Sequence, residues 1–172
     1  YHHQRVTQPL LLEHLHDLGI EISAGQLNHL LTQKHEDFHA EKDGLLEAGL
    51  QVSNHIQVDD TGARHDGKNG YCTFIGNELF AWFESTQSKS RVNFLELLRA
   101  GRTDDVLNAG ALEYMARHKL PQKTLHLLEE GKSFANKEEW DRSLAAVGIT
   151  GPKHIRIATE GALTGSLLAQ GF

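Results

Sequence analysis

The stretch IQVDDTG at residues 56–62 decides the fold. Ile56 and Val58 alternate with a polar residue, which is the period-two pattern of a strand with one buried face. Asp59 and Asp60 follow as adjacent carboxylates. Neighbouring side chains of a strand point to opposite faces, so these two residues are expected to have different roles. The alternative is a strand that ends in a polar turn, in which Asp-Thr-Gly is turn chemistry alone.

The residues that follow predict a three-stranded meander and a helix. Turn-forming residues at 66–70 separate a first strand at 56–64 from a second at 71–75. Gly76-Asn77 is a two-residue hairpin signal before a third strand at 79–83. The nearly continuous apolar character of this third strand predicts burial on both faces. Ser88 or Ser90 is expected to cap the next helix, which Gly101 closes.

The flanking segments are predicted to be helical. Residues 7–18 form an amphipathic helix that Thr7 can cap. A second helix starts at Ser23 with a capping box completed by Gln26, and it extends to about residue 47 with a break expected near His35. The two helices are compatible with a helix-turn-helix, and a plain helical hairpin is the alternative.

Charge and composition restrict the class of protein. The chain of 172 residues is 39% hydrophobic and 23% charged, an ordinary globular balance. The net charge is −6, and residues 1–55 carry three basic and eight acidic side chains. Nucleic-acid binders usually have a basic footprint, so these numbers argue against tight DNA binding by this chain alone and favour the plain hairpin.

The compartment is predicted from what the sequence lacks. A single cysteine, Cys72, excludes an intramolecular disulfide and a cysteine-based zinc cluster, and it fits a reducing environment. No apolar run reaches the roughly 18 residues of a transmembrane helix, and no secretory leader is visible. We therefore expect a cytoplasmic protein without a membrane partner.

The predicted fold class is α+β with three regions. Residues 1–50 form a helical, helix-turn-helix-like region. Residues 51–102 hold the three-stranded antiparallel meander and its helix. Residues 103–172 are mostly helical, with a brief extended run at 106–108.

Several blocks of sequence, spread over nearly the whole chain, carry a resemblance to a known family. They are QPLLLEHL (8–15), ISAGQL (22–27), VDDTGARH (58–65), NGYCT (69–73), GNELFAWF (76–83) and IATEGAL (157–163). These blocks resemble bacterial insertion-sequence transposases, and within them the insertion-sequence sixty-six family. The resemblance implies that residues 51–102 are the first half of a ribonuclease-H-like catalytic core and that residues 103–172 belong to an insertion.

The activity that the resemblance implies is the cutting and joining of transposon DNA ends by an Asp-Asp-Glu triad with two magnesium ions. Such ions clamp the attacking and leaving oxygens of a phosphoryl transfer, and Mg²⁺ prefers oxygen ligands. The family pattern Ala-Asp-Glu-Thr corresponds to residues 58–61. This correspondence selects Asp59 as the catalytic and metal-binding residue. Asp60 stands where the family has Glu. The second Asp and the Glu are expected beyond Phe172, so the chain alone is expected to be inactive and not to bind Mg²⁺ tightly.

The resemblance also implies partners. Transposon-end DNA would be the substrate of the full-length protein, and a homo-oligomer would form the active complex. Arg64, Lys68, Lys89 and Arg91 are candidates for contacts with the DNA backbone, as are Arg99 near the end of the predicted helix and Arg102 just after it. A solvated helix face is the alternative for the helical residues. The alternative function is a non-catalytic helix-turn-helix module for DNA binding or multimerisation.

The strand pattern assigns the two carboxylates to different faces independently of the family. Asp60 shares its face with Ile56 and Val58, which is the face expected to pack against a helix. Asp59 then points to the open face. Asp60 is expected to accept hydrogen bonds from backbone amides near Thr61 and Gly62.

Two further acidic sites are not selected as triad members. The pair Asp104-Asp105 precedes only a weak extended run, and Glu160 lies within a helix of the expected insertion.

Overall fold

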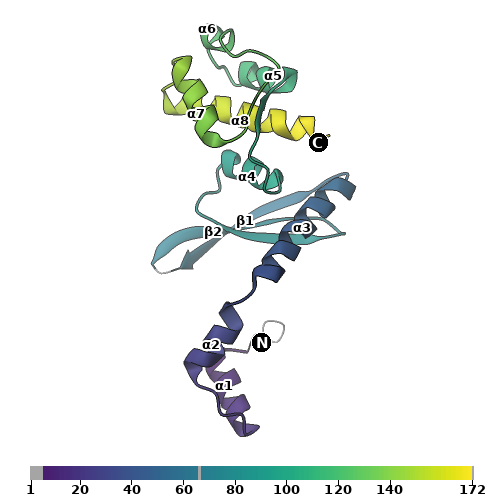
Figure 1. The fold of residues 1–172 in the computed structure, drawn as a ribbon, viewed down its shortest axis with the longest axis vertical. Coiled ribbons are helices and arrows are strands. Elements are labelled where there is room, and N and C mark those ends of the chain that lie inside the picture. The colour runs from purple at the N-terminus through teal and green to yellow at the C-terminus, as the bar shows by residue number, and fades with distance from the viewer. Residues whose placement is uncertain (1–5, 66, 172) are drawn as a thin grey trace. The chain divides into compact units, whose positions relative to one another are not determined.

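The computed structural model describes residues 6–65 and 67–171, except for the side chain of His65. The chain divides into two compact units, Tyr1–Gly44 and Leu45–Phe172. Figure 1 shows the order of the elements along the chain. The fold is α+β, as the sequence predicts, with helices first, then a three-stranded antiparallel sheet, a helix and further helices.

The first unit contains α1 (Gln8–Asp17), α2 (Ala24–Thr32) and the beginning of α3 (Glu36–Val52). The capping box of α2 is confirmed, because the Ser23 hydroxyl accepts from the Gln26 amide at 3.1 Å and the Gln26 side chain accepts from the Ser23 amide at 3.0 Å. Thr7 occupies the N-cap position of α1, as expected, but its side chain makes no capping hydrogen bond. The break expected near His35 separates α2 from α3.

The meander consists of β1 (Gln57–His65), β2 (Lys68–Gly76) and β3 (Ala81–Thr86), paired in that order. The strands differ from the prediction at both turns. Residues 68–70 continue β2, which leaves a tighter first turn, and the predicted two-residue hairpin is instead a longer loop between Gly76 and Ala81. Asn77 builds this loop, since its amide donates to Phe80 O at 3.0 Å and its side chain accepts from the Leu79 amide at 2.9 Å.

One face of the sheet is packed and the other is open. Trp82 is 4% exposed, whereas its neighbour Phe83 is 54% exposed, so the expected burial of β3 on both faces is wrong. Alternation along the strand places these side chains on opposite faces, and helices cover one face only. The core on that side contains Leu46, Leu50, Ile75, Phe80, Trp82, Leu95, Leu98, Leu163 and Leu167.

The helix α4 (Arg91–Leu98) packs Leu95 and Leu98 in the first core. The elements after it form a second core, which α8 joins to the first. They are β4 (Asp105–Leu107), α5 (Ala109–Arg117), α6 (Gln122–Leu125), β5 (Lys132–Phe134), α7 (Lys137–Ala146) and α8 (Pro152–Ala169). Ser90, one of the two predicted caps, caps α4. The strand β4 pairs antiparallel with β5, in a sheet separate from the meander. Ile157, Ala158 and Ala162 of α8 pack in the second core, while Leu163 and Leu167 pack in the first.

The central place of α8 bears on domain organisation. Because one helix supplies side chains to both cores, Leu45–Phe172 is one compact unit (Figure 1). The predicted domain boundaries after residues 50 and 102 stay predictions. Within residues 6–65 and 67–171, no helix combines the length and apolar character needed to cross a membrane.

Candidate functional site

Asp59 and Asp60 lie in the interior of β1, paired with Phe74 and Thr73 of β2. The strand continues to His65, so Thr61 and Gly62 also belong to the ladder. The interpretation of Asp-Thr-Gly as a turn is therefore wrong. Regular pairing on β2 holds the backbone of both acidic residues in a defined position.

Asp60 lies on the packed face, as the strand pattern predicts, but Val58 on the same face is 39% exposed, so the expected burial of Val58 is wrong. Asp60 is half-buried, and its Oδ1 accepts a hydrogen bond of 2.6 Å from the Thr73 hydroxyl. Thr73 is 1% exposed, and its oxygen also lies 3.2 Å from the Thr86 hydroxyl. The expected hydrogen bonds from backbone amides near Thr61 and Gly62 are wrong, because those residues continue the strand. Asp60 therefore has a structural partner in the sheet.

Asp59 is exposed on the open face. Its neighbour across the ladder is Phe74, which pairs in turn with Phe83. The two aromatic rings are in contact, with centroids 5.3 Å apart. A ligand that reaches this face would thus meet a carboxylate beside an apolar aromatic surface.

A magnesium site is incomplete within this chain. Among residues 6–65 and 67–171 there is no group of three or more His, Cys, Asp or Glu side chains that could hold a metal ion. Asp59 and Asp60 diverge to opposite faces, so only one of them can contribute to a site on the open face. A single carboxylate does not supply the oxygen ligands that a bound Mg²⁺ needs, and the described residues do not fit the ion by themselves.

Two of the predicted DNA-contacting side chains lie at the closed end of the β1–β2 hairpin. Arg64 and Lys68 are both exposed, and Arg64 Nη2 donates to Gly67 O at 3.3 Å. Lys68 also lines a shallow cavity of about 310 Å³ together with residues of β2, β3 and the segment after β3.

The other two predicted contacts lie where α4 begins, and each cation is placed over an aromatic ring. The Lys89 ammonium is 5.7 Å from the Tyr71 ring centroid, and the Arg91 guanidinium is 5.5 Å from that of Tyr114. Such contacts fix the direction of flexible cationic side chains at a modest gain. Lys89 therefore lies beside β2, whereas Arg91 lies beside α5.

At Arg99 the structure differs most from what the sequence predicts. Arg99 is 9% exposed, so neither a DNA contact nor a solvated helix face describes it. Its Nη1 donates to the Asp104 carbonyl at 2.9 Å and lies 3.6 Å from Asp105 Oδ1. Asp105 is 3% exposed on β4. The sequence does not mark this buried ion pair, because Asp105-Val106-Leu107 shows no alternation of polar and apolar residues.

Glu160 is a second buried acid that the sequence did not single out. It is 6% exposed on α8, and its Oε2 accepts from the Tyr114 hydroxyl at 2.7 Å. Burial and this hydrogen bond raise the pKa of Tyr114 to about 12. Glu160 thereby connects α8 to α5, and its partners account for it as a structural residue.

We expect Asp105 to make stability depend on pH. Its pKa is raised from 3.8 to about 6, chiefly by burial and against the pull of Arg99. Between these values the folded chain holds a proton that the unfolded chain has lost, so the free energy of unfolding falls as pH rises, by up to about 3 kcal/mol. The acidic neighbours Glu96, Asp104 and Asp141 act in the same direction as burial.

The test of this expectation is urea unfolding of the wild type and Asp105→Asn at a series of pH values from about 4 to 7.5. The variant cannot ionise, so its stability relative to the wild type should increase across this range. The attraction to Arg99 acts only on the ionised carboxylate and is already contained in the pKa of about 6, so it reduces the size of this pH dependence without removing it. A stability difference that is constant with pH would contradict the assignment.

The fold and the exposed carboxylate define an α+β protein whose three-stranded sheet keeps one face open. No protein-family profile matches the chain, and no solved structure matches it. The chain is similar to a protein of Sinorhizobium fredii (strain NBRC 101917 / NGR234) that bears the name "uncharacterized protein y4jO". The two are 36% identical over 132 residues, which make up 74% of this chain and 41% of that protein. The chain thus spans less than half the length of this relative.

Proposed function

We propose that this chain is part of a DNA transposase of the Asp-Asp-Glu class, to which it contributes the first catalytic carboxylate. The observation that carries the proposal is the position of Asp59, which is exposed on the open face of the sheet within a regularly paired strand. Carboxylates that act on a metal ion or substrate need this combination of access and a rigid backbone. The resemblance of residues 58–61 to the family pattern selects the same residue.

The order of elements supports the same proposal. Three antiparallel strands are followed by a helix and then by a further strand, β4. The three strands and the helix are in the order that the resemblance implies for the beginning of a ribonuclease-H-like core. Among the described residues β4 pairs with β5, so it does not extend the meander as a parallel strand next to β1. The outer edge of β1 therefore offers the place where further strands of a larger core would add.

The incomplete set of ligands leads to a prediction about activity. The chain of 172 residues is expected not to nick supercoiled plasmid DNA in Mg²⁺ or Mn²⁺, because one carboxylate cannot fix two metal ions. The product of the complete reading frame that contains the chain is expected to cleave and join DNA carrying the ends of its element.

A plasmid-nicking and strand-joining assay on both proteins tests the proposal. Metal-dependent nicking by the isolated chain that disappears in Asp59→Ala would contradict the need for further ligands. A complete product that binds the DNA ends but shows no cleavage under any divalent cation would contradict the proposed activity. That second result would favour the non-catalytic binding module.

A further inference from the structure

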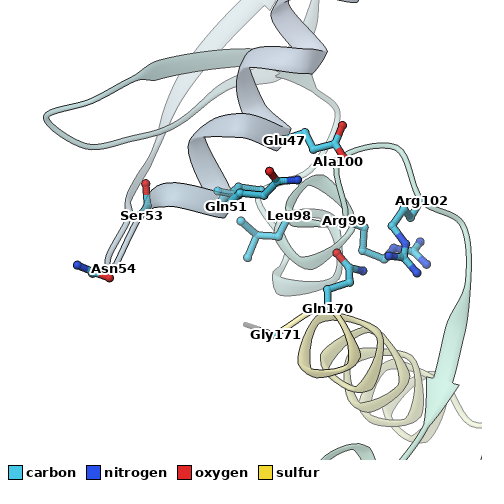
Figure 2. A pocket seen from close by; sticks show the side chains of 11 residues that line it. Glu47, Gln51, Ser53, Asn54, Leu98, Arg99, Ala100, Arg102, Gln170 and Gly171 are labelled. Atoms are coloured by element: carbon cyan, nitrogen blue, oxygen red, sulfur yellow. The ribbon is translucent and has the colours of Figure 1, made fainter.

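A polar cavity of about 650 Å³ lies where the C-terminal ends of α3, α4 and α8 meet, within the unit Leu45–Phe172. Figure 2 shows its side chains, with the Arg99 and Arg102 guanidinium groups near the Gln170 amide. Gln51 and Asn54 add amide groups to the wall, and Glu47 is the acidic side chain among the lining residues.

Two buried nitrogen donors at this wall have no acceptor. Arg99 uses Nη1 on the Asp104 carbonyl, but its Nε is buried without a hydrogen-bond partner. Gln170 Nε2 is buried and unpartnered as well. Unpaired buried donors are costly, and they are rare in native proteins unless water or a ligand satisfies them.

Arg102 is held in position at the same wall. Its Nε donates to Asp104 Oδ1 at 3.1 Å, and the side chain remains 55% exposed. The Asp104 carbonyl meanwhile accepts from both Arg99 Nη1 and the Ser166 hydroxyl. Asp104 therefore fixes both arginines and α8 at one point, which pre-organises the donors before a ligand arrives.

We propose that this cavity binds a phosphate oxyanion through Arg99 Nε, Gln170 Nε2 and the charge of Arg102. The free edge of a guanidinium matches two oxygens of a phosphate. Binding at Arg99 Nε requires the Gln170 amide to turn, so that both donors face the cavity. Gln170 lies just beyond the end of α8, where its backbone amide donates to Leu167 O at 3.0 Å.

The phosphate could come from two sources. The ligand is either a free phosphate or a phosphodiester of a nucleic-acid backbone, because both present the same oxygens to the guanidinium and amide donors. Asp104, Asp105 and Glu47 offset much of the cationic charge, so we expect a dissociation constant on the order of 1 mM.

The experiment follows the Arg99 Nε–H and Gln170 side-chain resonances of the 172-residue chain by NMR. Sodium phosphate is titrated to about 50 mM against sodium chloride of equal ionic strength. If the cavity binds phosphate, both resonances shift saturably with phosphate and not with chloride. The proposal is overturned if these resonances do not shift, or if chloride produces the same shifts.

Variants separate the site from general charge effects. Arg102→Gln and Gln170→Leu are each expected to weaken phosphate binding about tenfold or more. Arg117→Gln removes the same charge from an exposed side chain of α5 paired with Glu113, and it should leave binding unchanged. Equal phosphate affinity in all three variants would overturn the proposal.

A short abasic oligodeoxynucleotide identifies the source of the phosphate. If the oligonucleotide shifts the same resonances and competes with phosphate, the site takes a backbone phosphodiester. If phosphate binds and the oligonucleotide does not, the site takes a free phosphate; both results support an oxyanion site. The inference stands apart from the proposed transposase activity, because the binding measurement requires no DNA cleavage.

Discussion

Replacing Gly165 by alanine is expected to lower the free energy of unfolding by about 2 kcal/mol or more. At this residue α8 passes directly over β4, and an added methyl group would collide with the Val106 carbonyl oxygen. It would also lie 3.0 Å from Ala111 Cβ and 3.2 Å from Asn108 Oδ1. None of these atoms belongs to the end of a long flexible side chain, so the helix must move. Alanine's better helix propensity recovers only about 1 kcal/mol.

A matched glycine tests whether the effect comes from packing. Gly44 lies in the middle of α3 with open space around the position of a Cβ. Gly44→Ala is therefore expected to stabilise the chain, by about 0.5–1 kcal/mol from helix propensity alone. Urea unfolding of both variants gives the comparison. Unchanged or increased stability in Gly165→Ala would mean that α8 and β4 are not in the close contact described.

Features governed by local sequence were the ones that could be predicted. The capping box at Ser23, the cap at Ser90 and the meander follow from residues close together in the chain, and the structure contains all of them. The assignment of Asp59 and Asp60 to opposite faces needs only the strand period, and it is also confirmed. Asp59 was thus found as a candidate without any knowledge of the tertiary fold.

Features governed by distant packing could not be predicted. Phe83 and Trp82 are both apolar, and only the position of the covering helices decides which one is exposed. Likewise, Arg99 and Asp105 are near in sequence, but their burial depends on α8, whose Ser166 binds the Asp104 carbonyl from 62 residues away. The oxyanion cavity arises from the same approach of α8, so no local motif marks it.

Asp59→Asn is expected to abolish DNA strand transfer by the complete protein, with a loss on the order of 100-fold or more. The expectation rests on the proposed function, in which the exposed Asp59 carboxylate is the first ligand of the catalytic metal site. The amide has nearly the same shape but lacks the negative charge. Since Asp59 is exposed and none of the described residues donates a hydrogen bond to its side chain, the free energy of unfolding should change by less than about 0.5 kcal/mol.

Asp60→Asn is the matched control, because it removes the same charge from the adjacent residue of β1. Asp60 accepts a 2.6 Å hydrogen bond from Thr73 on the packed face. Weakening this charged hydrogen bond should lower the free energy of unfolding by about 1 kcal/mol, while activity at a permissive temperature is retained. A transposition assay with parallel urea unfolding separates the two roles. Wild-type activity in Asp59→Asn would show that Asp59 is not catalytic. An inactive but fully stable Asp60→Asn would instead assign the catalytic role to Asp60. In that case β1 would have to present its other face to DNA.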